Sequence, residues 1–126
     1  MILLVVDDNP DIISLVSMMA LRILGGDKCQ IISGRNGQEG LELLQAAESM
    51  PDVIISNLRM PQMDGLTFLR EVRARPQWSD IHLVMMSATQ TAEARHQAAA
   101  SGAEFFLAKP FNLNDFKDLL AHFFTS

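Results

Sequence analysis

Side chains that could hold a metal ion and a phosphoryl group follow short apolar runs at several points of this 126-residue chain. Asp7 and Asp8 follow the first run, Ser87 follows the fourth and Lys109 the fifth. Two adjacent carboxylates repel each other unless a cation lies between them, and Mg²⁺ typically takes one or two carboxylates and keeps several waters. An ammonium group facing the two aspartates, with a hydroxyl nearby, suits an anionic oxygen. Together these residue types predict a site for phosphoryl transfer, in which catalysis is mostly positioning and charge neutralisation.

The third apolar run ends at a residue that cannot act as the acceptor in such a site. Asn57 follows the run at 53–55 and precedes a turn at 60–65, "MPQMDG". A carboxylate at position 57 could take a phosphoryl group as an acyl phosphate. The amide oxygen of Asn57 is a poor nucleophile because the lone pair of its nitrogen is delocalised, but it can still ligate a cation without a formal charge. The sequence therefore predicts a phosphoryl-transfer site that lacks its nucleophile.

Apolar runs alternate with helical patterns along the chain. The runs lie at 2–6, 29–33, 52–56, 81–86 and 103–108. Most of them lack polar alternation, which is typical of strands buried on both faces of a parallel sheet. Between them, apolar residues recur at three- and four-residue steps, and Asn9-Pro10 and the pair Asn36 and Glu39 mark helix starts. These patterns predict a strand–helix unit repeated five times.

Strands that alternate with helices form a parallel sheet with right-handed crossovers and helices on both faces. We predict one α/β domain over residues 1–126, a flavodoxin-like doubly wound five-stranded parallel sheet with the strand order 2-1-3-4-5. Ligands of such sheets bind at the carboxyl ends of the strands, near the switch between the first and third. The polar residues that follow strands one, three, four and five should therefore converge on one edge.

Composition limits the classes of binding partner and the cellular compartment that fit this chain. The net charge of −5 argues against direct nucleic-acid binding, because a DNA-binding face must offset phosphate charge with Lys and Arg. No apolar run approaches the roughly 18 residues of a membrane span, and "MILLVVDD" lacks the flanks and length of a signal peptide. Cys29, the one cysteine, cannot form an internal disulfide. We expect a cytoplasmic protein with no direct nucleic-acid or membrane partner.

Four motifs in this order and spacing resemble the receiver domain of two-component response regulators, over essentially the full length of the chain. They are "VVDD" (5–8), "PDVII" with "MPQMDG" (51–65), "MMSA" (85–88) and "KPF" (109–111). The resemblance implies a signalling module rather than a classical enzyme, although the family catalyses its own phosphoryl transfer and dephosphorylation. It also implies a sensor histidine kinase or phosphotransfer protein as partner. A downstream effector domain or protein would bind the face formed by the fourth helix, fifth strand and fifth helix.

The resemblance assigns metal and phosphoryl roles to individual residues. Asp8 matches a direct Mg²⁺ ligand, Asp7 a ligand largely through water, and the main-chain carbonyl of Arg59 completes the protein's share. Ser87 matches the hydroxyl that binds the phosphoryl group, and Lys109 the lysine that pairs with it. These five positions carry the family's pattern without change.

Further positions match the family's regulatory residues. Phe106 matches an aromatic switch residue whose rotamer reports phosphorylation. Arg59 and Thr89 fall where the family tunes the rate of dephosphorylation, and Lys109-Pro110 matches a peptide bond that is usually cis. The departure falls on Asn57, which stands where the family carries its phospho-accepting aspartate. As written, the chain should not be phosphorylated, and its Mg²⁺ affinity should be weakened because two carboxylates remain instead of three.

Two explanations fit this substitution. It is natural, and makes a pseudo-receiver that acts as a phosphorylation-independent protein-interaction module, or it is a recent or engineered change in a phosphorylatable receiver. Intact Asp7, Ser87 and Lys109 favour the second, or a pseudo-receiver that still uses its metal. A haloacid-dehalogenase phosphatase would need Asp-x-Asp after the first strand, which "DDNPD" does not supply. An FMN-binding flavodoxin would place hydroxyls there, whereas two aspartates repel a phosphate.

Aromatic residues outside the site carry packing predictions. Trp78 should pack over the sheet. A continuous final helix cannot easily bury both Phe123 and Phe124, so either they seal the core or one of them contacts a partner or a downstream segment. The three histidines lack the spacing of metal ligands and are assigned ordinary roles.

Overall fold

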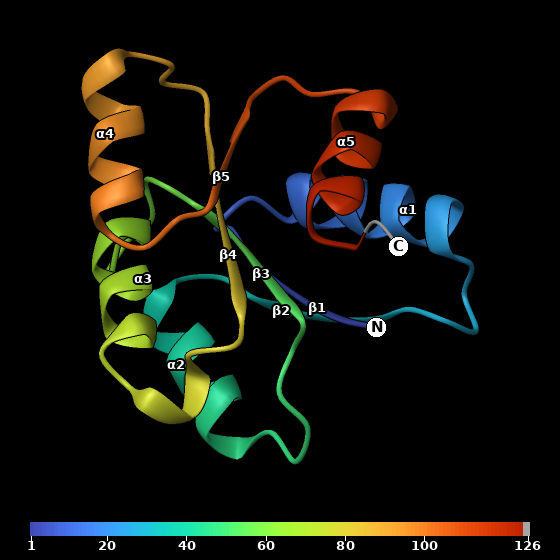
Figure 1. Cartoon of the computed structure of the whole chain (residues 1–126), viewed down its shortest axis with the longest axis horizontal. Coiled ribbons are helices and arrows are strands. Elements are labelled where there is room, and N and C mark those ends of the chain that lie inside the picture. Colours follow the sequence, from blue (N-terminus) through green and yellow to red (C-terminus); the bar gives the residue numbers. More distant parts are fainter. Residues whose placement is uncertain (125–126) are drawn as a thin grey trace.

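Strands and helices alternate five times in the computed structural model, which describes residues 1–124 (Figure 1). The strands are β1 (Ile2–Val6), β2 (Gln30–Gly34), β3 (Val53–Asn57), β4 (His82–Ser87) and β5 (Phe105–Ala108). The helices are α1 (Pro10–Leu24), α2 (Gly37–Ala46), α3 (Gly65–Arg73), the short 3₁₀ helix η1 (Pro76–Trp78), α4 (Ala92–Ala100) and α5 (Leu113–Phe124). Most strands begin one or two residues later than the apolar runs predicted, because strand pairing and not apolarity sets their starts.

The five strands form one parallel sheet in the order β2-β1-β3-β4-β5, which confirms the predicted doubly wound fold. Helices α1 and α5 cover one face of the sheet, and α2, α3 and α4 cover the other (Figure 1). The strand order reverses its direction of growth between β1 and β3, so the loops after these two strands diverge to opposite faces. The switch point therefore lies where Asp7 and Asn57 end their strands.

Alternate residues of each inner strand pack into two separate hydrophobic cores. Leu3 and Val5 of β1 lie in the core beneath α1 and α5, whereas Leu4 and Val6 lie in the core beneath α2 and α3. Burial of both faces was predicted, and it holds for β3, β4 and residues 3–6 of β1, whose apolar side chains are almost fully buried. It fails for β2, where Ser33 is exposed, because β2 is an edge strand.

Side-chain caps begin the helices where the sequence predicted them. Asn9 Oδ1 accepts from Asp11 N at 2.9 Å, and Asn36 Oδ1 accepts from Glu39 N at 2.9 Å. Helix α3 ends at Arg73, before Pro76. The reason is local, since Pro76 lacks an N–H and disfavours helical backbone at the residue before it, and it begins η1 instead.

The connection from β3 to α3 is tight and needs a glycine. Gly65 N donates to Leu58 O at 2.9 Å, which closes the loop at 58–64. A Cβ at Gly65 would collide with the carbonyl oxygen of Asn57. Backbone packing at this glycine therefore places the loop against the end of β3.

Trp78 packs as predicted, and the two final phenylalanines of the described chain differ in exposure. Trp78 is 3% exposed and lies in the core beneath α2 and α3, whereas Phe124 is 40% exposed and Phe123 is partly buried. Cys29 is buried and free, and this burial raises the pKa of its thiol. Within residues 1–124, every helix is too short or too polar to cross a membrane.

Candidate functional site

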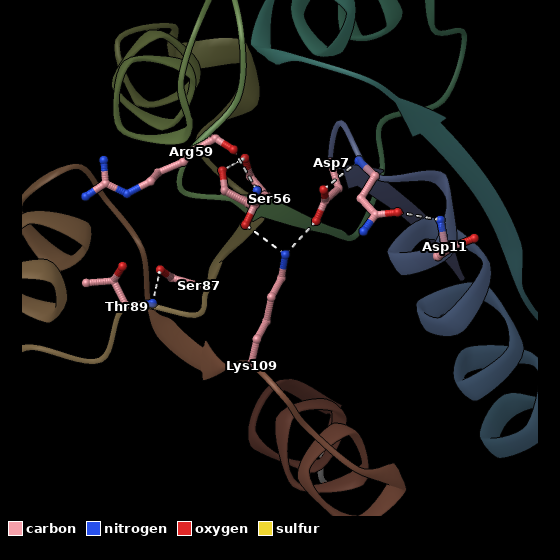
Figure 2. Close-up of polar contacts among 9 residues, drawn as sticks. Asp7, Asp11, Ser56, Arg59, Ser87, Thr89 and Lys109 are labelled. Carbon is pink, nitrogen blue, oxygen red and sulfur yellow. Dashed lines mark hydrogen bonds and ion pairs between the residues drawn. The ribbon is translucent and has the colours of Figure 1, made fainter.

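Lys109 joins the carboxyl ends of three strands. Its backbone N–H donates to Ser87 O at 2.8 Å, which extends the β4–β5 ladder by one residue. Its side chain crosses the sheet edge, and Nζ donates to Asp7 Oδ2 at 2.9 Å and to Asn57 Oδ1 at 3.0 Å. Figure 2 shows the ammonium between Asp7 and the end of β3. The Lys109-Pro110 peptide is cis, as the family resemblance implied.

Asp7 is the buried member of the acidic pair. Its backbone N–H donates to Gly34 O at 3.1 Å and continues the β1–β2 ladder, so its side chain is directed like that of a strand residue. Asp7 Oδ1 accepts from Asn9 N at 2.9 Å, and Oδ2 accepts from Lys109. The Asp7 side chain is 1% exposed and the Lys109 side chain 17%. A carboxylate so deep is stable only with a partner of opposite charge and hydrogen bonds to its oxygens.

Asp8 lies on the surface beside this pair. Asp8 is exposed in the bend that follows β1, whereas Asp7 is buried. Lys109 was expected to face both aspartates, and within residues 1–124 its ammonium makes an ion pair with Asp7 and none with Asp8. The lysine is shared instead between Asp7 and Asn57.

Asn57 links Lys109 to the loop after β3. While its Oδ1 accepts from Lys109, its Nδ2 donates to the main-chain carbonyl of Arg59 at 2.7 Å. The Arg59 side chain is exposed and turns away from this carbonyl (Figure 2). Asn57 itself is partly buried, and the hydroxyl of the neighbouring Ser56 donates to the Asn57 carbonyl at 3.1 Å.

Ser87 and Thr89 form a separate pair at the end of β4. Ser87 is 3% exposed, and its Oγ accepts from Thr89 N at 3.0 Å. This pair lies to one side of the side chains that Lys109 Nζ contacts, and no side-chain hydrogen bond joins the two sets within residues 1–124 (Figure 2). The Ser87 hydroxyl proton is therefore free to donate to a group that enters between the two sets.

Phe106 lies on β5 beneath helix α4, away from the polar side chains. The guanidinium carbon of Arg95 lies 4.6 Å from the centre of the Phe106 ring, a cation–π contact. Helix α4 buries only Ala94 and Ala98 on its apolar face. The contact of the exposed Arg95 with Phe106 therefore adds to the packing of Ala94 and Ala98.

The donor set at this edge suits a hard cation. Asp7, Asp8, Asn57 and the Arg59 carbonyl supply only oxygen atoms, the ligands that Mg²⁺ prefers. Between residues 1 and 124, however, acidic, histidine and cysteine side chains form no cluster of three or more that could hold a metal. With an amide at position 57, the charge available to a cation comes from two aspartates.

Two contacts at the site were not predicted from the sequence. The bond from Asn57 Nδ2 to Arg59 O depends on which way an amide turns, and nothing in the sequence encodes that. The Arg95–Phe106 contact joins residues on different elements. A basic residue on the otherwise Ala-rich helix was the one available signal.

The chain has known relatives. Residues 3–121 match the response regulator receiver domain family. The DNA-binding dual master transcriptional regulator RpaA of Synechocystis is 33% identical over 113 residues, which are 90% of this chain and 44% of RpaA. The chain therefore spans less than half the length of that relative.

Solved structures of receivers superpose on nearly the whole chain. The Vibrio cholerae chemotaxis response regulator CheY4 has a TM-score of 0.85 at 29% identity and covers 98% of each chain. The receiver domain of the Pseudomonas aeruginosa sensor histidine kinase PA1611, described with a magnesium ion coordinated in its active-site cleft, has a TM-score of 0.84 at 25% identity and covers 99% of this chain and 98% of its own. Together with the motifs and the fold, these matches establish that the chain belongs to the response regulator receiver domain family of two-component systems.

Proposed function

We propose that the chain is a receiver module of a two-component phosphorelay in which Asn57 stands at the phospho-acceptor position. The observation that carries this proposal is the position of residue 57 at the carboxyl end of β3, bonded to Lys109 and next to Asp7. A nucleophile at this point would have an ammonium group and two aspartates around it. Because the side chain is an amide, the chain as written is not phosphorylated, and self-catalysed phosphoryl transfer and dephosphorylation are lost with it.

Magnesium is the cation that this donor set favours. Asp8 would bind it directly, Asp7 largely through water, and the Asn57 oxygen and Arg59 carbonyl would complete the protein's ligands. When bound, Mg²⁺ supplies positive charge to the oxygens of a phosphoryl group. Asn57 weakens this binding because it removes one formal negative charge.

The remaining residues have roles that follow from their positions. Lys109 pairs with an anionic oxygen, and the Ser87 hydroxyl donates to one. Phe106 is the switch residue of the α4-β5-α5 face, through which a downstream effector domain or protein is bound. Arg59 and Thr89 occupy the positions that tune the rate of dephosphorylation. The module, residues 1–126, is cytoplasmic and recognises a histidine kinase or phosphotransfer protein.

A phosphorylation-independent interaction module is the second candidate. The observation that favours it is the hydrogen bond from Asn57 Nδ2 to Arg59 O, since it completes the network without a metal or phosphoryl group. A natural pseudo-receiver would keep one conformation and signal by binding alone. The two candidates differ in what restoring the carboxylate does.

Reaction with acetyl phosphate separates them. The chain, Asn57→Asp and the control Asn114→Asp, which adds the same charge at an exposed position of α5, are incubated with acetyl phosphate and Mg²⁺ and their intact masses measured. We expect a phosphoryl adduct on Asn57→Asp alone. If Asn57→Asp does not react, more of the phosphoryl-transfer site than residue 57 has lost its function, and the interaction-module candidate is favoured. An adduct on the native chain would refute the assignment of position 57 as acceptor.

A further inference from the structure

The carboxamide of Asn57 is hydrogen-bonded at both of its ends. Oδ1 accepts from Lys109 Nζ at 3.0 Å, and Nδ2 donates to Arg59 O at 2.7 Å. Lysine has only donors and a carbonyl only accepts, so these partners fix which end of the amide is oxygen. An inverted amide would place two donors face to face at Lys109 and two acceptors face to face at Arg59. The observed orientation is therefore the one that satisfies every group.

We propose that Asn57 is a positioning residue. Its side-chain N–H donates to the Arg59 carbonyl and takes the place of a divalent cation as the positive partner of that oxygen. This inference rests on the proposed function, in which position 57 and the Arg59 carbonyl belong to one cation site. The loop at 58–64 is then held closed without a divalent cation. The Asn57 amide group thus takes over the role of the metal in holding this loop.

An aspartate at position 57 could not make this bond. An ionised carboxylate only accepts hydrogen bonds, so its oxygen and the Arg59 carbonyl would repel each other until a cation lay between them. In the native chain, conversely, a cation that used both the Asn57 oxygen and the Arg59 carbonyl would compete with Lys109 and with Nδ2 for the lone pairs of these two oxygens. The loop at 58–64 is therefore held without a metal when residue 57 is asparagine, and needs a metal when it is aspartate.

Two backbone amides report on the loop. Gly65 N donates to Leu58 O at 2.9 Å, and Gly37 N of α2 donates to Met63 O at 3.1 Å. Space is tight around both glycines, since a Cβ at Gly37 would lie 2.7 Å from Met63 Cγ. Opening of the loop must break both bonds, so hydrogen exchange at Gly65 and Gly37 measures how firmly the loop is held.

The test is hydrogen exchange followed by NMR, in chelator and in excess Mg²⁺, on the native chain, Asn57→Asp and the control Asn114→Asp. We expect the Gly65 and Gly37 amides of the native chain to exchange at the same rate in both conditions. In Asn57→Asp they should exchange about tenfold faster in chelator, which corresponds to ~1.4 kcal/mol, and slow again with Mg²⁺. The control should behave as the native chain does.

The native chain provides a second measurement that needs no folded variant. The Asn57 side-chain amide protons should exchange more slowly than those of exposed Asn114, in chelator as well as in Mg²⁺. The proposal is overturned if Mg²⁺ slows Gly65 exchange in the native chain as much as in Asn57→Asp, or if the Asn57 amide exchanges as fast as that of Asn114. Failure of Asn57→Asp to take a phosphoryl group refutes the proposed function instead, and leaves these exchange rates as they are.

Discussion

Charged side chains link neighbouring strands at both ends of the sheet, the carboxyl ends and the amino ends of the strands. These ends are called the carboxyl edge and the amino edge, and their two networks differ in burial. At the carboxyl edge, the Lys109 and Asp7 side chains are 17% and 1% exposed. At the amino edge, Glu104 before β5 pairs with Arg73 at 2.8 Å and with His82 at 2.9 Å. The exposed fractions there are 26% for Arg73 and 37% for both Glu104 and His82. The same kind of contact is thus made once in the interior and once at the surface.

This difference decides what each network contributes. A surface ion pair is screened by water and contributes about 0–1 kcal/mol, whereas removing one partner of a buried pair leaves an uncompensated charge. The amino edge has other support, since the His82 ring stacks on Phe123 at 4.5 Å and Arg73 also donates to Ile81 O at 2.8 Å. At the carboxyl edge, the side-chain contacts between strands are made by the Lys109–Asp7 ion pair and the hydrogen bond of Lys109 to Asn57. Its stability and its chemistry therefore rest on the same few side chains.

Removing the lysine should give the largest effect. Lys109→Met leaves the Asp7 carboxylate buried without its cation, so we expect a loss of ~3–5 kcal/mol in the free energy of unfolding. Urea denaturation measures it. The double variant Asp7→Asn/Lys109→Met should recover most of the loss because no buried charge is left unpaired. A loss below ~1 kcal/mol for Lys109→Met would mean that Asp7 is solvated and that the two edges do not differ.

Restoring a carboxylate at the same edge should give an intermediate effect. Asn57→Asp adds a third carboxylate to a site that already holds Asp7 and Asp8. Like charges close together raise the energy of the ionised forms, so we expect the metal-free variant to be less stable than the native chain by ~1–2 kcal/mol. Mg²⁺ should remove this deficit and raise the melting temperature of Asn57→Asp more than that of the native chain. Equal melting temperatures of the two proteins in chelator and in magnesium would contradict this electrostatic account.

The fold was predictable because it depends on patterns that many residues repeat. Five apolar runs separated by capped helical segments allow few arrangements, and the parallel sheet then brings the ends of β1, β3, β4 and β5 to one edge. The convergence of Asp7, Asn57 and Lys109 followed from topology alone. An error of one residue in a strand boundary does not change which loops meet.

Finer features of the site were not predictable because they depend on single torsion angles. Whether Asp7 or Asp8 turns inward is decided by how far the β1 ladder continues, and Asp7 N extends it to Gly34 O. The orientation of the Asn57 amide is decided by two partners that lie apart in the sequence, Arg59 and Lys109. The convergence of Asp7, Asn57 and Lys109 was therefore predictable, while the contacts among them needed the structure.

The smallest expected effect lies at the amino edge. Glu104→Gln removes the charge that Arg73 and His82 share but keeps a carbonyl oxygen for a hydrogen bond, so the free energy of unfolding should fall by ~0.2–1 kcal/mol. The exposed Glu48→Gln is the matched control, with no ion pair recorded for it in the described chain. Because surface pairs are screened, raising the salt concentration should shrink the Glu104→Gln effect, while the loss in Lys109→Met should change little. If Glu104→Gln instead lowered the free energy of unfolding as much as Lys109→Met does, exposure would not govern the strength of these networks. The contacts among Arg73, Glu104 and His82 would then stabilise the fold as much as the Lys109 contacts do.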